Sequence, residues 1–162
     1  MTSIIIRRVG DMDCRALAEL LNEIINVGGT TAYTNEVTSS YIQQKINSGT
    51  RSAWHLAESS QGEVLGFQWI EQSGALPVKA AEIATFAQVG KTGLGIGSKL
   101  FEATKKVAVA LDYTWIRANI RSDNSGGLIY YQSRGFEDYG VEKNVTLADG
   151  TIVDKVLKRY DL

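Results

Sequence analysis

The stretch KTGLGIGSKLFEATKKVAVA, residues 91–110, places three glycines within five positions and then continues as a helical pattern. Glycine loses more conformational entropy on folding than other residues and has no side chain to pack. Such a run is expected where a ligand approaches the main chain or where a turn needs unusual dihedral angles. The first N–H groups of a helix have no intrahelical partner, and the helix dipole is positive there. The stretch therefore indicates an anion site suited to a phosphate or pyrophosphate.

Two familiar glycine motifs do not fit this stretch. GKT at residues 90–92 resembles the end of a P-loop, but that motif needs a further glycine at the position of Thr85. The dinucleotide fingerprint G-x-G-x-x-G also fails, because a serine or a leucine stands at its last position. A glycine-rich turn between a strand and a helix, without a ligand, stays open as an alternative at this stage.

Composition limits the class of protein. The 162 residues are interpreted as one domain, 1–162, with a single core. Seventeen basic and eighteen acidic residues give a net charge of -1, so nucleic acid is not an expected partner. No apolar run approaches the ~18 residues of a membrane span, so a membrane is not an expected partner either.

Cys14 and His55 are the only residues of their types. A single cysteine cannot form an internal disulfide, and this pair cannot build a metal site of the Cys/His type, so no metal is expected. Cys14 lies in a helical pattern and His55 in a strand pattern, which favours packing for both over a nucleophile pair. The first 13 residues are too short for a signal peptide, and we expect a cytoplasmic location.

The hydrophobic pattern predicts strands interspersed with helices. Strands are expected at 3–9, 52–59, 63–72, 80–89 and 113–120, with a closing hairpin at 141–161 turned by Asp149-Gly150. Helices are expected from Asp11 or Asp13 to Gly28, from a cap at Thr38 or Ser39 to Gly49, over 96–110 and over 123–135. This order indicates an α/β (α+β) fold with one mixed, mostly antiparallel sheet and helices on both faces.

The segment FAQVGKTGLGIGSKLFEA, residues 86–103, resembles motif A of the GCN5-related N-acetyltransferases. In that motif a strand leads into a (Gln/Arg)-x-x-Gly-x-(Gly/Ala) loop and a helix. Gly95-Ile96-Gly97 match the Gly-x-Gly positions. Thr92 stands where the family usually has Gln or Arg, a departure that concerns a side chain and leaves the main-chain amides in place.

A second segment, NSGGLIYYQSRGF, resembles the family's Asn-x-x-Ala-x-x-x-Tyr-x-x-x-Gly-Phe signature. Asn124, Tyr131 and Gly135-Phe136 stand at the matching spacing, and Gly127 replaces the common alanine. In element order the resemblance covers about residues 3–140. Within the family, NVGGTTAYTNEVT and AEIATFAQV resemble the phosphinothricin and amino-acid N-acetyltransferase branch.

The resemblance implies an enzyme that moves the acetyl group of acetyl-CoA to the amine of a small molecule or amino acid. Direct transfer in a ternary complex is expected. A non-catalytic acyl-CoA-binding sensor module and an acetyltransferase that acts on a protein N-terminus or lysine remain as alternatives. Homodimerisation is left open.

The resemblance also implies which residues hold coenzyme A. In this family the strand before the glycine loop splays from its neighbour, main-chain groups in the gap bind pantetheine, and loop amides bind the pyrophosphate. The matching strand positions are Thr85, Phe86, Ala87 and Val89, and the loop positions are Thr92, Gly93, Leu94, Gly95, Ile96, Gly97 and Ser98. Asn124 would cap the next helix and bind the cofactor, although a plain N-cap is equally compatible with the sequence.

Two side chains are expected to move protons. Tyr131 stands at the family's general-acid position, where a phenol with a pKa of ~10 can contact the cofactor and protonate the departing thiolate. A core aromatic, with Tyr130 beside it, is the alternative. Glu82 is the only acidic residue in the strand 80–89 and aligns with the branch's glutamate, so it is the candidate base. An exposed strand glutamate is the alternative.

The acceptor pocket is the part that the sequence describes least. Loops 30–38 and 73–79 are expected to border it, with Tyr33, Glu36 and Lys79 as polar candidates. Lys79 would pair with an amino-acid carboxylate, although a lone loop lysine is usually solvated. The aromatic and arginine residues that the branch usually carries before the strand are not evident in SGALPVK.

Overall fold

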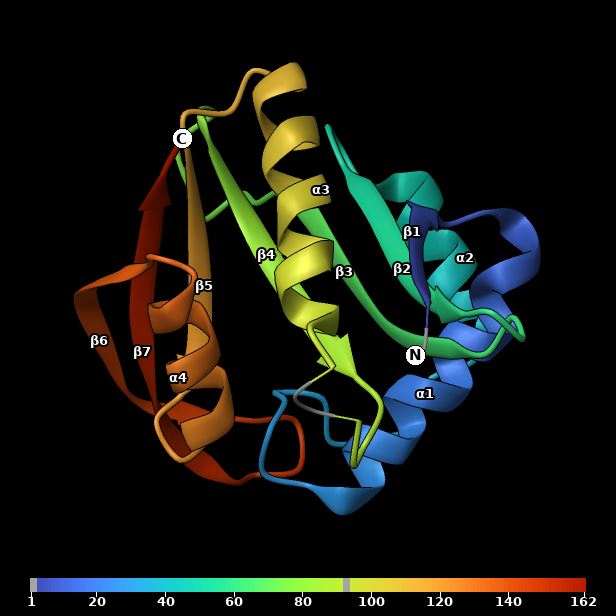
Figure 1. The fold of residues 1–162 in the computed structure, drawn as a ribbon. Helices are drawn as coiled ribbons and strands as arrows, with labels where there is room; N and C mark the ends of the chain where they lie inside the picture. The colour runs from blue at the N-terminus through green and yellow to red at the C-terminus, as the bar shows by residue number, and fades with distance from the viewer. Residues whose placement is uncertain (1–2, 92–93) are drawn as a thin grey trace.

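The computed structural model describes residues 3–91 and 94–162 (Figure 1). Two positions expected at the cofactor, Thr92 and Gly93, lie outside the described residues. The elements follow in the order β1 (Ile4–Arg8), a 3₁₀ turn (Asp11–Asp13), α1 (Cys14–Val27), α2 (Ser39–Ser48), β2 (Ala53–Ser59), β3 (Val64–Gln72), β4 (Ala80–Ala87), α3 (Ile96–Ala110), β5 (Trp115–Arg121), α4 (Ser125–Ser133), β6 (Glu137–Thr146) and β7 (Ile152–Asp161).

The strands form one seven-stranded sheet in the order β1-β2-β3-β4-β5-β7-β6. Each neighbouring pair is antiparallel except β4 and β5, which are parallel. Helices α3 and α4 cover one face, and α1 and α2 pack on the other (Figure 1). This arrangement confirms the predicted fold, a mixed and mostly antiparallel sheet with helices on both faces.

Alternation of side chains along the strands supplies a separate core for each face. Toward α1, the buried rings of Trp54 and Trp69 stack with centroids 4.2 Å apart. Toward α3, Ile70 and Ile116 are buried with Phe101. Strand β3 is therefore apolar on both of its faces, as expected for a central strand that helices cover from two sides.

Local hydrogen bonds fix the helix starts. The Thr38 hydroxyl accepts a hydrogen bond from Tyr41 N at 3.0 Å, which confirms this residue as the cap of α2. The Asp13 side chain makes no cap hydrogen bond to α1, because its carboxylate accepts from Gly10 N at 2.6 Å and from Arg7 at 2.8 and 2.9 Å. A 3₁₀ turn precedes α1, and the α-helix begins at Cys14 with Asp13 in the N-cap position, one of the two starts that the sequence indicates.

The closing hairpin is longer than the expected 141–161. Strand β6 already begins at Glu137, directly after the buried Phe136. It is the edge strand, and most of its side chains are exposed, so its first residues lack the apolar alternation by which a strand is recognised.

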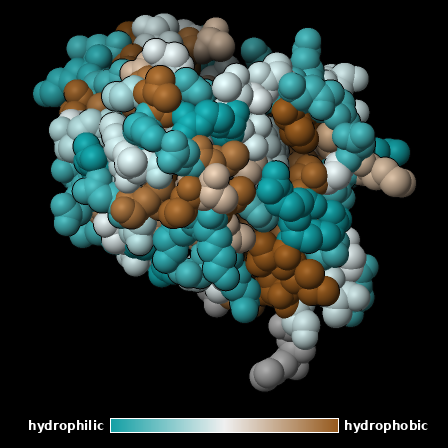
Figure 2. All heavy atoms as spheres, turned by 90° about the horizontal axis from the view of Figure 1, so that it is seen from above, coloured by the Kyte–Doolittle hydropathy of each residue, from teal (hydrophilic) through white to brown (hydrophobic). Residues whose placement is uncertain are grey.

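The surface at the end where α3 finishes is mostly hydrophilic, with small and separate hydrophobic patches (Figure 2). Among the helices of residues 3–91 and 94–162, none combines the length and the apolar character needed to span a membrane.

Candidate active site

Strand β4 is open along part of one edge. Its antiparallel pairing with β3 runs from Gln72–Ala81 to Gly66–Ala87, whereas its parallel pairing with β5 is limited to Ala80–Trp115, Ala81–Ile116 and Glu82–Arg117. Both strands continue beyond this point, β4 to Ala87 and β5 to Arg121. The strands therefore separate toward the glycine loop, and β4 main-chain groups in residues 83–87 face a gap. Such groups need water or a ligand as hydrogen-bond partners.

The glycine loop presents its main chain at this opening. Gly90 and Gly95 have φ angles of +82° and +77°, in the left-handed region that glycine adopts without strain. Gly95 is the N-cap of α3 and offers no side-chain cap, and Lys99 N donates to Gly95 O at 3.0 Å. The N–H groups of the three residues after Gly95 thus lack helical partners. A Cβ on Gly95 would meet no heavy atom within 4 Å, so the turn is open to a ligand.

Gly97 allows α4 to approach the first turn of α3. A Cβ on Gly97 would lie 2.4 Å from Cε1 of Tyr130, and the Tyr130 hydroxyl donates to Gly97 O at 2.7 Å. Arg134 Nη1 donates to Ser98 Oγ at 2.5 Å in the same turn. These contacts bring a guanidinium to the positive end of the helix, and both features favour a bound anion.

Tyr131 lies inside the fold on the α4 side of the gap. Its side chain is buried, with 7% exposed, and its hydroxyl lies 2.8 Å from Thr85 Oγ1 on β4. Burial raises the pKa of the Tyr131 phenol well above its ordinary value, so the group keeps its proton at neutral pH. The neighbouring Tyr130, whose pKa burial raises to about 12, has its proton committed to Gly97 O.

Glu82 occupies the last position at which β4 and β5 are paired. Its carboxylate receives two hydrogen bonds from Arg117 on β5, Nε to Oε2 at 2.7 Å and Nη2 to Oε1 at 3.2 Å. Burial raises the pKa of the Glu82 carboxyl, and Arg117 acts in the opposite direction without cancelling the rise. Because neighbouring side chains alternate along a strand, Glu82 points to the face opposite Ile83 and Thr85. Glu82 and Tyr131 therefore lie on opposite faces of the sheet.

The loop between α1 and α2 borders the wide end of the gap. Arg121 at the end of β5 donates to Thr31 O at 3.1 Å, and Asn124 Nδ2 donates to Thr30 O at 3.1 Å. The Oδ1 atom of Asn124 accepts from Gly127 N at 3.0 Å, so this side chain caps α4 as expected and also holds the loop.

The expected acceptor residues separate into two groups. Tyr33 is partly buried against the α1 core, and its hydroxyl lies 2.9 Å from that of Tyr41. Glu36 is exposed in the same loop and accepts from Asn26 at 3.1 Å. Lys79 precedes β4 at the end opposite the glycine loop, where its Nζ pairs with Asp112 at 2.8 Å. The structure does not bring Lys79 to the gap.

The remaining residues expected at the cofactor lie at the end of β4, in the glycine loop and at the start of α3. Ala87 ends β4, and Phe86 is buried toward α1 rather than in the gap, so only its main chain faces β5. Val89 and Leu94 are exposed in the loop, and Ile96, the first residue of α3, is buried in a cluster with Leu65 and Leu100.

Sequence reasoning missed Arg117, Arg134 and Gln68. Arg117 belongs to the alternating run WIRANIR, whose charged positions signal only an exposed strand face. Gln68 is fully buried within β3, and a polar residue in an otherwise apolar run was the available signal. Arg134 stands at a variable position within NSGGLIYYQSRGF, directly before Gly135.

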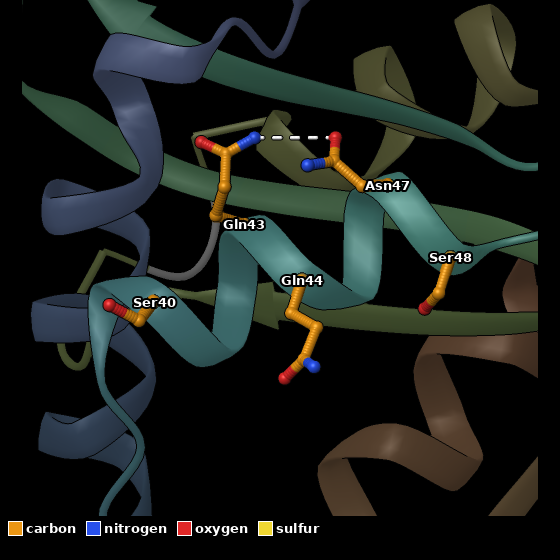
Figure 3. Close-up of a pocket in the computed structure, with 5 residues that line it drawn as sticks. All are labelled: Ser40, Gln43, Gln44, Asn47 and Ser48. Carbon is orange, nitrogen blue, oxygen red and sulfur yellow. Dashed lines mark hydrogen bonds between the residues drawn. The ribbon is translucent and has the colours of Figure 1, made fainter.

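A surface hollow elsewhere is lined by polar residues of α2 alone (Figure 3). They are Ser40, Gln43, Gln44, Asn47 and Ser48. Gln43 Nε2 donates to Asn47 Oδ1 at 3.3 Å, within one face of the helix. The hollow shares no residue with the gap and is not part of the candidate site.

No family model matches the chain. A protein of Bacillus subtilis (strain 168) named "Putative phosphinothricin acetyltransferase YwnH" is 27% identical over 153 residues, which cover 93% of this chain and 90% of the relative. A crystal structure described as that of "a putative phosphinothricin N-acetyltransferase" has a TM-score of 0.86 at 24% identity and covers 99% of both chains.

A second solved structure, a GNAT superfamily phosphinothricin acetyltransferase (Pat) from Sinorhizobium meliloti, was determined in complex with AcCoA. It has a TM-score of 0.87 at 18% identity and covers 98% of this chain and 88% of its own. The comparisons agree with the two sequence motifs and confirm the resemblance that these indicate. The chain has the fold of the GCN5-related N-acetyltransferases along nearly its whole length.

Proposed function

We propose that this chain is a cytoplasmic, acetyl-CoA-dependent N-acetyltransferase whose acceptor is the amine of a small molecule or amino acid. The observation that carries the proposal is the open edge of β4, because the gap after Glu82 leads directly to the uncapped start of α3. The names of the relative and of the two solved structures, one of them in complex with AcCoA, support the same function.

The residues around the gap fit coenzyme A. The open main chain of Thr85, Phe86 and Ala87 offers the hydrogen bonds that an extended, amide-containing pantetheine arm requires. The free N–H groups after Gly95, together with the Arg134 guanidinium, suit a diphosphate. When bound, the cofactor supplies an acetyl group activated as a thioester.

Tyr131 is the proposed general acid. Its buried hydroxyl keeps its proton at neutral pH, and its position on the α4 side of the gap faces the open part of β4. Donation of this proton to the departing thiolate stabilises the leaving group. Tyr130 does not compete for the role, because its proton is bound to Gly97 O.

Glu82 is the proposed base, acting on the acceptor ammonium directly or through a water molecule. A pKa raised by burial makes the carboxylate a stronger base than a free glutamate. Arg117 favours the ionised form of the carboxyl, against the effect of burial, and orients it. Glu82 and Tyr131 lie on opposite faces of the sheet. The acceptor ammonium would therefore lose its proton to Glu82 on one side of the gap, and the thiolate would receive a proton from Tyr131 on the other.

Direct transfer to the amine is supported by the placement of Cys14 and His55, the two residues considered as a nucleophile and its base. Cys14 lies in the α1 core, where its Sγ contacts Gln43 Oε1 at 3.4 Å, and His55 is buried in β2. The two residues thus do not form a nucleophile–base pair.

The proposal is tested by incubating the protein with acetyl-CoA and a panel of amines while free thiol is measured. The panel contains phosphinothricin, methionine sulfone and short peptides. Release of thiol with a small amine or amino acid is expected. Binding of coenzyme A without turnover of any amine would favour a sensor module, and turnover of peptides alone would move the acceptor to proteins.

A further inference from the structure

A buried polar network lies between β3, α3 and α4, behind the gap. Its central member is Gln68 on β3, which is 0% exposed, and Thr104 on α3 is 1% exposed. Gln68 Nε2 contacts Thr85 Oγ1 at 2.8 Å and Tyr130 Oη at 3.1 Å, and Gln68 Oε1 contacts Thr104 Oγ1 at 2.5 Å. A buried amide of this kind is retained in a core only when its hydrogen-bonding groups are satisfied.

The direction of the hydrogen bonds in this network is fixed from one end. Gly97 O is a carbonyl oxygen and can only accept, so the Tyr130 hydroxyl must donate to it. The Tyr130 oxygen then accepts from Gln68, which places the NH₂ group of the Gln68 amide on that side. The amide oxygen consequently faces α3 and receives the Thr104 proton.

Thr85 connects Gln68 to the Tyr131 hydroxyl. The second N–H of Gln68 donates to Thr85 Oγ1, so the Thr85 hydroxyl must direct its own hydrogen elsewhere. The Tyr130 oxygen also lies near Thr85 but already accepts from Gln68. The Tyr131 oxygen, 2.8 Å from Thr85 Oγ1, is within direct hydrogen-bond distance. With Thr85 as donor, the hydrogen of the Tyr131 hydroxyl is free to point away from Thr85.

We propose that Gln68, acting through Thr85, turns the hydroxyl hydrogen of Tyr131 toward the gap, so that both are positioning residues for proton donation. This inference rests on the proposed function, in which Tyr131 gives its proton to the thiolate. After donation, the Thr85 hydroxyl supplies a hydrogen bond to the phenolate oxygen. Thr85 also acts against the burial of Tyr131 by lowering the pKa of the phenol, which agrees with this direction.

The orientation of the hydrogens can be observed without any turnover. A neutron crystal structure of the deuterated protein is expected to show a deuterium on Thr85 Oγ1 directed at Tyr131, and the Tyr131 deuterium directed into the gap. A Tyr131 deuterium directed at Thr85 would overturn the inference. This result does not depend on whether an amine substrate is found, so it separates the inference from the proposed function.

Kinetics of three variants test the consequence. Thr85→Val removes the hydroxyl with little change in shape, and kcat is expected to fall about 10- to 100-fold, as for loss of one hydrogen bond to a developing charge. KM for acetyl-CoA should stay within about twofold, because the main chain of residue 85 is kept. Thr85→Ser restores the donor and should recover most of the loss.

The double variant Thr85→Val, Tyr131→Phe distinguishes a positioning role of Thr85 from a structural one. In a Tyr131→Phe background no proton is left to orient, so Thr85→Val should change kcat by less than about threefold. Wild-type kcat in Thr85→Val, failure of Thr85→Ser to recover activity, or additive losses in the double variant would each overturn the inference. Absence of turnover in the unmodified protein would instead refute the proposed function, and the neutron structure would then decide the inference alone.

Discussion

The two edges of β4 differ along the same eight residues. The edge toward β3 is paired throughout from Ala81 to Ala87, whereas the edge toward β5 is paired only as far as Glu82. Strand β5 is itself paired with β7 along its whole length, from Trp115 to Arg121. One strand thus belongs to the rigid sheet through one edge and offers free main-chain groups through the other. The site is therefore an interruption of the sheet between β4 and β5, and each of these strands is paired along its other edge.

The largest effect is expected on the α4 side of the open edge. Tyr131→Phe removes only a hydroxyl, so affinity for the cofactor should hold while kcat falls by about 10²- to 10⁴-fold, the range of a general acid. Tyr113→Phe is the matched control, since this buried tyrosine donates to Arg51 O and takes no part in the gap, and it should cost less than about tenfold in kcat. Steady-state kinetics with one amine compares them. Equal losses in the two variants would contradict the assignment.

A smaller effect on kcat is expected at Glu82, the last residue of β4 that is paired with β5. Glu82→Gln keeps the size of the side chain and one acceptor oxygen for Arg117 but removes the base, so kcat should fall by about 10²-fold at neutral pH. Activity should partly recover at higher pH, where more of the amine is free. The measurement is a pH–rate profile of both proteins with the same amine. A variant with the wild-type profile would leave water or another carboxylate as the base.

The secondary-structure elements and the spacing of the motif residues could be predicted from the sequence, whereas the side-chain contacts around the open edge of β4 could not. The strands, the span of α3 and the spacing of Asn124, Tyr131 and Gly135 follow from local patterns. The ion pair between Glu82 and Arg117 joins residues 35 positions apart, and no local pattern encodes it. The link from Gln68 to Thr104 is of the same kind, because it depends on the register of strands and helices after folding.

A substitution in the glycine loop can weaken cofactor binding at the open edge without any change in β4. Gly97→Ala places a Cβ where the Tyr130 ring lies, so the ring must shift and the first turn of α3 with it. We expect affinity for coenzyme A to fall by about tenfold, on the order of one lost hydrogen bond to a charged group. Titration calorimetry gives the value. Gly74→Ala, where a Cβ meets no heavy atom within 4 Å, is the control and should bind normally.

The smallest change is expected from Arg117, and it concerns pH rather than maximal rate. Arg117 lowers the pKa of Glu82 against the effect of burial, so Arg117→Gln should raise that pKa further. Because the base acts only when deprotonated, the acidic limb of the pH–rate profile should move to higher pH. A limb that stays in place, or moves to lower pH, would show that another group controls it.

Hydrogen exchange of individual amides, followed by NMR with and without acetyl-CoA, compares the two edges most directly. Amides of β4 in residues 83–87 that face β5, and those at residues 96–98, are expected to exchange rapidly in the free protein and to become protected when acetyl-CoA binds. Amides of β4 that face β3 should be protected in both states. Saturation with acetyl-CoA that leaves the open edge unprotected, or protects a different surface, would contradict the account.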